Sequence, residues 1–143
     1  MVREINFDMD GTIADLYGVK NWLPYLQLRS PYPYFAAKPL VNMAELEAEL
    51  IRLQRKGYKI NIISWLAKCD DEKYDELVTN AKLTWIRRNF PNFWFDKVII
   101  TRYGTRKETL AQGILFDDEE NNRKWWGDGA YDVHNILGIL REI

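Results

Sequence analysis

The chain has 143 residues, which fits one domain, and its 47% hydrophobic fraction is ordinary for a globular protein. Its 20 basic and 21 acidic residues nearly cancel, so charge gives no argument for a nucleic-acid or anionic-membrane partner. Cys69 is the single cysteine, which excludes an internal disulfide and suits a reducing compartment. No apolar run approaches the roughly 20 residues of a membrane span, and the charged Arg3 and Glu4 argue against a signal peptide. We expect a single cytoplasmic domain over residues 1–143.

Short β-like runs alternate with helical patterns along the chain. Strands are predicted at 2–7, 59–64, 97–101 and 113–116, and the later ones are nearly continuous in apolar residues, as in strands buried on both faces. Apolar spacing predicts longer helices at 42–57, with Asn42 as N-cap, and at about 71–89. Shorter helical patterns cover 106–111, 119–126 and 133–142. This alternation predicts an α/β protein with a three-layer, Rossmann-like parallel sheet.

The segment 16–40 has a different composition. It is rich in aromatic residues, and three of the chain's five prolines fall between Pro31 and Pro39, so a long regular helix is not expected there. We interpret it as a small insertion, a reduced cap, that lies over the strand tips. Its aromatic side chains would either pack against the core or stack on a ligand such as a nucleobase.

Polar residues end four of the predicted strands. Asp8 and Asp10 follow the first strand, and Ser64, Thr101 and Asp117 end the next three. The carboxyl ends of parallel strands share one sheet edge, where ligands bind in α/β proteins. Two acids crowded at a strand tip repel each other unless a cation lies between them, which suits Mg²⁺ and phosphoryl chemistry. The alternative is a turn with solvated acids, since Asp-Gly is common in turns.

These residues stand in the order of the four motifs of the haloacid dehalogenase (HAD) superfamily, whose members are mostly phosphatases, and the chain resembles that superfamily. The first motif, D-x-D-G-T after a strand, is Phe7-Asp8-Met9-Asp10-Gly11-Thr12. The second, a strand ending in Thr or Ser, is Ile60-Asn61-Ile62-Ile63-Ser64. The third is a Lys before the last strand, and the fourth, a strand ending in acids, is Ile114-Leu115-Phe116-Asp117-Asp118.

The resemblance implies a role for each of these polar residues. Asp8 would be the nucleophile that forms an aspartyl-phosphate, and Asp10 would act as general acid and then as general base. Ser64 would hydrogen-bond a phosphoryl oxygen. Mg²⁺ would be held by Asp8, by the backbone carbonyl of Asp10 and by an acid from Asp117 and Asp118. Of these two, we favour Asp117 as the direct ligand and Asp118 as its support.

Two lysines compete for the phosphate-stabilising role. Lys82 lies beside the apolar stripe of its predicted helix, from which its amine could reach the strand tips. Lys107 follows the strand that ends at Thr101 and precedes Asp117 by ten residues. We favour Lys82, with Lys107 as a rival or second contributor. The alternative for either one is an ordinary solvated lysine.

Within the superfamily, the second half of the chain resembles the 5′(3′)-deoxyribonucleotidases, in a Lys-x-x-Trp helix, an Ile-x-x-Thr-Arg strand and the paired aspartates. The resemblance implies a small phosphorylated substrate, a nucleotide. The cap that holds the nucleoside in that family is, however, larger than the 16–40 segment of this chain. Trp65 follows the second motif where smaller residues are usual, so we expect it to narrow or roof the phosphate pocket. The small cap leaves open a homodimer in which one chain covers the other's site.

Two other functions are kept as alternatives. One is a phosphatase acting on nucleic-acid ends, sugar phosphates or phosphoproteins, since a small cap leaves the site open to larger substrates. The other is a non-catalytic protein that binds phosphate and metal. The presence of both Asp8 and Asp10 argues against the second alternative, because a decayed member would most simply lose one of them. Neither alternative involves a membrane, and nucleic acid is expected only as a phosphorylated end.

Overall fold

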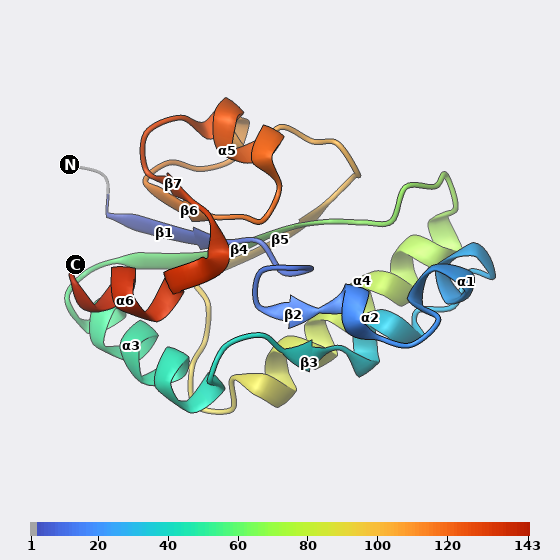
Figure 1. Ribbon diagram of the computed structural model, residues 1–143, viewed down its shortest axis with the longest axis horizontal. Helices are drawn as coiled ribbons and strands as arrows, with labels where there is room; N and C mark the ends of the chain where they lie inside the picture. Colours follow the sequence, from blue (N-terminus) through green and yellow to red (C-terminus); the bar gives the residue numbers. More distant parts are fainter. Residues whose placement is uncertain (1–2) are drawn as a thin grey trace.

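A five-stranded parallel sheet organises the protein (Figure 1). The computed structural model describes residues 3–143. The strand order is β5-β4-β1-β6-β7, so the first strand lies at the centre. The strands are β1 (Glu4–Phe7), β4 (Lys59–Trp65), β5 (Lys97–Thr101), β6 (Ile114–Phe116) and β7 (Ala130–Tyr131). Every pairing in this sheet is parallel, so the carboxyl ends of the strands meet at one edge.

The four predicted strands are confirmed within the part of the chain that the structure describes. Position 2 of the first predicted strand lies outside the described residues. β4 runs one residue beyond Ser64, to Trp65. The short edge strand β7 was not predicted, because two residues after a glycine-containing turn carry no alternation for a pattern to detect.

Both long helices form as predicted, and Asn42 caps the first of them as expected. In α3 (Met43–Arg55), the Asn42 side chain accepts from the Glu45 amide at 3.1 Å. In α4 (Glu72–Asn89), Asp71 accepts from the Tyr74 amide at 3.1 Å. The shorter patterns form α5 (Glu120–Trp126) and, at the C-terminus, the 3₁₀ turn η3 (Val133–Asn135) followed by α6 (Ile136–Arg141). The helix predicted at 106–111 is a single 3₁₀ turn, η2 (Lys107–Thr109).

The two faces of the sheet are covered differently. On one face, alternate side chains of the strands pack with α3, α4 and α6 into the main hydrophobic core; among them are Ile5, Phe7, Ile60, Ile62, Leu46, Leu50, Leu53, Trp85 and Leu140. On the other face, the Asn61 side-chain amide donates to Asn6 Oδ1 at 2.9 Å, and Asn6 Nδ2 donates to the Gln112 carbonyl at 2.8 Å. These buried amides tie β1 and β4 to the segment before β6, which fixes the strand ends relative to one another.

The 16–40 insertion consists of short elements fastened to α4. It contains η1 (Leu16–Gly18), α1 (Trp22–Gln27) and α2 (Tyr32–Ala36), and its base is closed by the antiparallel pair β2 (Ala14–Asp15) and β3 (Lys38–Pro39). Three α4 side chains donate to its backbone carbonyls: Tyr74 to Ser30, Trp85 to Ala37 and Arg88 to Phe35. Figure 1 shows α1 and α2 beside α4, beyond the carboxyl ends of the strands.

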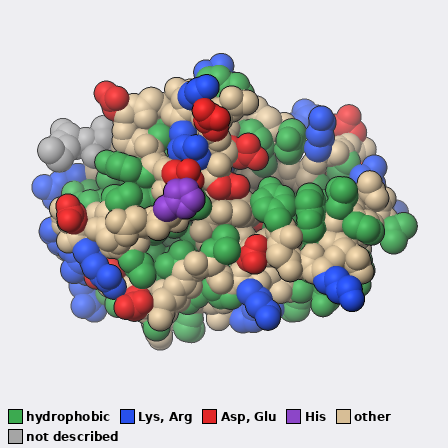
Figure 2. All heavy atoms as spheres, in the orientation of Figure 1, with side chains coloured by type: hydrophobic (Ala, Val, Ile, Leu, Met, Phe, Trp, Pro, Cys, Tyr) green, Lys and Arg blue, Asp and Glu red, His purple; other side chains and the backbone are tan. Residues whose placement is uncertain are grey.

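The surface of the insertion is unusually apolar. Figure 2 shows hydrophobic side chains gathered over this end of the molecule. The most exposed of them are Tyr17, Leu23, Leu28, Tyr32, Phe35 and Leu40. Across residues 3–143, no helix combines the length and apolar character needed to cross a bilayer.

Candidate active site

The loop after β1 presents two carboxylates at the carboxyl edge of the sheet. The Asp8 amide donates to the Phe116 carbonyl at 3.0 Å, which continues the β1–β6 pairing to the start of the loop. The chain then turns tightly, because three successive amides, those of Thr12, Ile13 and Ala14, donate to the Met9 carbonyl. The Thr12 hydroxyl donates to Asp8 Oδ2 at 3.0 Å and holds that carboxylate in place.

Lys107 bridges the acids of β1 and β6. Its ammonium donates to Asp8 Oδ1 at 2.8 Å and to Asp117 Oδ2 at 2.7 Å, and its side chain is almost fully buried. Burial by itself would lower the pKa of Lys107, but the two carboxylates outweigh it and raise that pKa above its usual value. Lys107 therefore stays protonated and brings one positive charge to Asp8.

Lys82 contacts Asp10, the other acid of the loop. Its fully buried ammonium donates to Asp10 Oδ2 at 2.9 Å, to the Ser64 hydroxyl at 2.6 Å and to the Trp65 carbonyl at 2.6 Å. Burial raises the pKa of Asp10 above its ordinary value, and the Lys82 ammonium opposes that shift. Neither Lys82 nor Lys107 is a solvated surface side chain. The structure brings both into the site, each against a different acid.

Asp117 and Asp118 differ sharply in how many of their oxygens are already used. Asp117 is fully buried and accepts from the Glu119 amide, from Lys107 and from the Asn122 side-chain amide. Asp118 has one contact of this kind in the described chain, with the Thr12 hydroxyl at 3.3 Å. Of the two carboxylates, Asp118 therefore has more oxygen capacity left to bind a metal ion. The preference for Asp117 as the direct metal ligand stays a prediction, and this geometry argues against it.

Three of these carboxylates form a cluster that can hold a metal ion. Ligand oxygens of Asp8, Asp117 and Asp118 lie within 4.8 Å of one another. Burial, with the nearby Asp8 charge, raises the pKa of Asp117 to about 6 and that of Asp118 to about 8. Carboxyl groups that resist ionising at the same time form a site that suits a hard divalent cation, because the cation would relieve the repulsion between their negative charges.

Gly11 is what allows Asp118 to lie so close to the loop. Its backbone has φ +82°, a conformation that favours glycine, and a Cβ at this position would overlap the Asp118 carboxylate. The glycine of the D-x-D-G-T motif therefore does two things here. It permits the turn, and it leaves the space into which Asp118 projects.

A cavity of about 350 Å³ opens over the two loop acids. Asp8, Asp10, Asn122 and Glu119 lie among its lining residues, together with residues of the insertion. Its aromatic lining residues are Tyr17, Trp22, Tyr34, Trp65 and Tyr103. The insertion thus lies over the strand tips, with several of its aromatic side chains facing the cavity rather than the core alone.

Trp65 lines this cavity and also anchors a loop. Its indole N–H donates to the Thr105 carbonyl at 2.8 Å. The centroid of its ring lies 5.0 Å from the centroid of the Tyr103 ring and 5.5 Å from the Lys107 ammonium. Thr101, predicted among the polar strand ends, hydrogen-bonds the Thr105 hydroxyl at 3.1 Å. Both contacts hold the 102–106 loop, which leads into Lys107.

Among the lining and supporting residues that were not predicted from the sequence are Thr12, Asn122 and Tyr103. Thr12 lies inside the D-x-D-G-T motif, so the motif itself carried the signal. Asn122 lies four residues after Asp118, and this helical spacing could have placed it near the acids. No sequence pattern singles out Tyr103.

Comparisons with known proteins do not supply a family for this chain. No protein-family model matches it, and no curated protein matches it. An assignment of function therefore rests on the site itself.

Proposed function

We propose that the protein is a Mg²⁺-dependent phosphomonoester hydrolase that acts through an aspartyl-phosphate on Asp8. The observation that carries the proposal is the position of Asp8. It lies 2.8 Å from a buried lysine, within a cluster of three carboxylates and beside a cavity that also reaches Asp10. A carboxylate so placed is both restrained and partly neutralised. These are the two conditions under which it can attack an anionic phosphate.

In the first step, an oxygen of Asp8 attacks the phosphorus and the ester P–O bond breaks. The departing alkoxide takes a proton from Asp10, so a neutral alcohol leaves and the phosphoryl group stays on Asp8. A carboxylate about 4 Å from a phosphate charge meets roughly 4 kcal/mol of repulsion at an effective dielectric of 20. Lys107 would offset that repulsion at Asp8. Ser64, which is buried and accepts a hydrogen bond from Lys82, would donate its hydroxyl hydrogen to a phosphoryl oxygen.

In the second step, water attacks the phosphorus of the aspartyl-phosphate. Asp10 takes the proton of that water, the P–O bond to Asp8 breaks, and inorganic phosphate leaves with Asp8 regenerated. The two steps return Asp10 to its protonated form, so the cycle is balanced. Lys82 holds the Asp10 carboxylate in one orientation for both proton transfers.

The donor set at the strand tips fits Mg²⁺, because it consists of oxygens alone. Asp8 and Asp118 would hold the ion with their side chains, together with the backbone carbonyl of Asp10. Asp117 would support them through Lys107 and Asn122. When bound, the ion supplies positive charge that offsets the phosphate oxygens.

A nucleotide is the substrate that the cavity fits best. Its lining combines five aromatic side chains with the carboxylates of Asp8 and Asp10, so a flat base and a phosphate would each find suitable contacts. We therefore propose the 5′(3′)-nucleotidase reaction, with the HAD superfamily as the family that the motifs indicate. Sugar phosphates, phosphoproteins and phosphorylated nucleic-acid ends are the other substrates to test.

The test is phosphate release with Mg²⁺ from a panel of substrates, comparing the native chain with Asp8→Asn. The panel holds 5′- and 3′-nucleoside monophosphates, sugar phosphates, a phosphopeptide and a phosphorylated oligonucleotide. We expect mononucleotide turnover that falls by about 10⁴-fold or more in Asp8→Asn. Asp128→Asn, at an exposed position outside the motifs and outside the cavity lining, should keep the native rate. Near-normal turnover in Asp8→Asn would remove Asp8 as nucleophile, and no turnover of any substrate would favour a binding role.

A further inference from the structure

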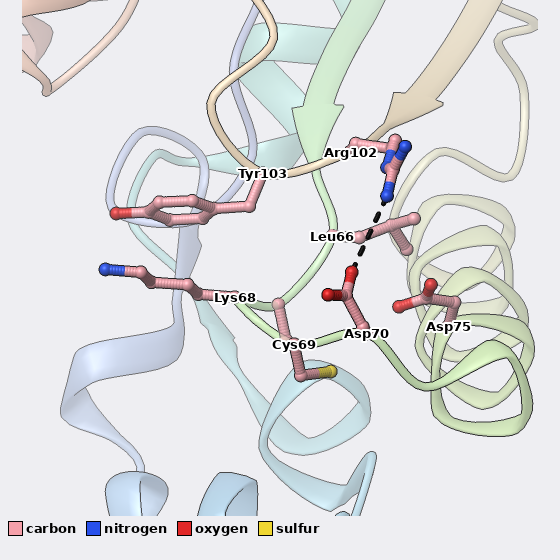
Figure 3. Close-up of a pocket in the computed structure, with 8 residues that line it drawn as sticks. Leu66, Lys68, Cys69, Asp70, Asp75, Arg102 and Tyr103 are labelled. Carbon is pink, nitrogen blue, oxygen red and sulfur yellow. Dashed lines mark ion pairs between the residues drawn. The ribbon is translucent and has the colours of Figure 1, made fainter.

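A second cavity, of about 500 Å³, lies next to the one over the loop acids. It is lined by the 66–70 loop that follows β4, by Arg102 and Tyr103 after β5, and by Asp75 of α4 (Figure 3). The two cavities share the lining residues Leu66, Ala67, Lys68 and Tyr103. Figure 3 shows Lys68 and Tyr103 side by side, with Arg102, Asp70 and Asp75 on the other side of the 66–70 loop. A substrate held at Asp8 could therefore extend past Lys68 and Tyr103 into this second cavity.

Two cations of this cavity are available to a ligand. The Lys68 ammonium lies 5.8 Å from the centroid of the Tyr103 ring, and no carboxylate in residues 3–143 pairs with it. Arg102 Nη2 lies 3.5 Å from Asp70 Oδ1, but the two side chains are 85% and 96% exposed. An ion pair this exposed contributes little, so an incoming anion can replace Asp70 on Arg102 at small cost.

Asp75 limits what kind of anion can bind. Its Oδ1 is shielded from solvent and has no hydrogen-bond partner in the part of the chain that the structure describes. A buried carboxylate oxygen normally accepts a hydrogen bond, so a ligand N–H or O–H is expected there. A bare anion would be repelled by Asp75. The cavity therefore fits a group that combines an anion with a hydrogen-bond donor.

We propose that this cavity binds a second, phosphate-linked nucleotide unit of the substrate. The second phosphate contacts Arg102 and Lys68, and a sugar hydroxyl or a base N–H donates to Asp75. The half-exposed Tyr103 ring offers a stacking surface at the same place. This inference rests on the proposed function and narrows it. Among nucleotide phosphomonoesters, the preferred substrate is the phosphorylated end of a short strand rather than a lone mononucleotide.

The experiment compares three substrates that each carry one phosphomonoester, at the position, 5′ or 3′, preferred in the panel above. In the 5′ series, they are thymidine 5′-monophosphate, the same compound with a 3′-methyl phosphodiester, and the 5′-phosphorylated dinucleotide. We expect kcat/KM to rise along this series. A higher kcat/KM for the methyl phosphodiester than for the monophosphate shows that the protein contacts the second phosphate. A further increase with the dinucleotide shows that it also contacts the second sugar or base. Equal kcat/KM for all three would overturn the proposal.

Two variants with opposite expected effects on substrate preference test the proposal further. Arg102→Ala should lower the ratio of kcat/KM for the dinucleotide to that for the monophosphate by roughly threefold to tenfold, since it removes a charge-assisted contact. Asp70→Asn should raise the same ratio, because it frees Arg102 from its exposed partner. Lys73→Ala, an exposed lysine of the same region outside both cavities, should leave the ratio unchanged. A ratio that moves in neither Arg102→Ala nor Asp70→Asn would also overturn the proposal.

Binding without turnover separates this inference from the proposed function. Tryptophan fluorescence of the Asp8→Asn protein can be titrated with the same three compounds and Mg²⁺. Tighter binding of the dinucleotide that depends on Arg102 supports the second cavity, even if the native chain hydrolyses nothing. Equal binding of all three compounds, or none, overturns the proposal whatever the rate of hydrolysis.

Discussion

The Lys107 ammonium lies 2.8 Å from Oδ1 of Asp8, although 99 residues separate them in the chain. A second buried lysine, Lys82, makes the equivalent contact with Asp10, at 2.9 Å. Each loop acid therefore has its own cation. The sequence posed a choice between the two lysines, whereas the structure assigns them to different partners, and this division leads to distinct predictions for their removal.

Lys107→Met should lower turnover by about 10²-fold to 10⁴-fold, because Asp8 loses the charge that offsets its approach to phosphate. Lys82→Met should also lower turnover, and it leaves the partly buried Asp10 carboxylate unpaired, which costs at most roughly 3–5 kcal/mol of stability. Phosphate release and thermal unfolding, measured with and without Mg²⁺, check both effects. Lys73→Met is the matched control. Full activity in Lys107→Met together with loss in Lys82→Met would support the prediction that Lys82 is the main phosphate-stabilising lysine.

Gly11→Ala should weaken both metal binding and folding. A left-handed residue other than glycine costs about 1–2 kcal/mol, and the new methyl group would displace the Asp118 carboxylate. We therefore expect a tenfold or greater loss of Mg²⁺ affinity, measured by calorimetric titration. Gly104→Ala, which has a similar φ of +87° and open space around its Cβ, isolates the backbone contribution. Equal metal affinity in the two variants would contradict the role given to Gly11.

Trp65→Phe should reduce the rate by loosening the loop that leads to Lys107. The phenyl ring keeps the apolar contact but loses the hydrogen bond to the Thr105 carbonyl, which contributes about 1 kcal/mol. The expected result is a several-fold fall in kcat with a small change in unfolding temperature. Trp94→Phe, at an exposed position outside the cavity, should leave kcat unchanged. If Trp65→Phe changes KM alone, the indole serves substrate binding rather than the loop.

In the presence of EDTA, stability should fall as the pH rises from about 5 to about 8. Burial and Asp8 raise the pKa of Asp118 to about 8, whereas an unfolded aspartate titrates near 3.9. Between these values, the native state holds a proton that the unfolded state has released, so raising the pH favours unfolding. Because Mg²⁺ binds the ionised carboxylate, its stabilising effect should be larger at pH 8 than at pH 6.

Thermal unfolding at several pH values, with EDTA or Mg²⁺, checks this expectation. Asp118→Asn should reduce the fall in stability, most of all between about pH 6 and pH 8, because the Asp118 carboxyl no longer titrates whereas Asp117 still does. A profile that is flat in the native chain, or that rises with pH, would contradict the crowded carboxylate cluster.

The strand pattern of the sequence predicted the sheet edge well. Parallel strands that end in Asp8, Ser64 and Asp117 must bring these residues together, because their carboxyl ends coincide. Lys82 and Lys107 were found as candidates, but their partners depend on how α4 and the 102–106 loop pack, which no local pattern encodes. The second cavity was missed for the same reason. Arg102 and Asp75 lie on separate elements and meet only through the 66–70 loop.

The insertion is held by three side chains of α4, the same helix that carries Lys82. A cover fastened in this way moves with the helix and cannot swing over the reacting atoms as a hinged domain does. In the proposed cycle, bulk solvent would therefore keep access to the phosphorylated Asp8. In such an arrangement, small alcohols compete with water for the phosphoryl group, and added glycerol or methanol would divert part of the product into new phosphate esters.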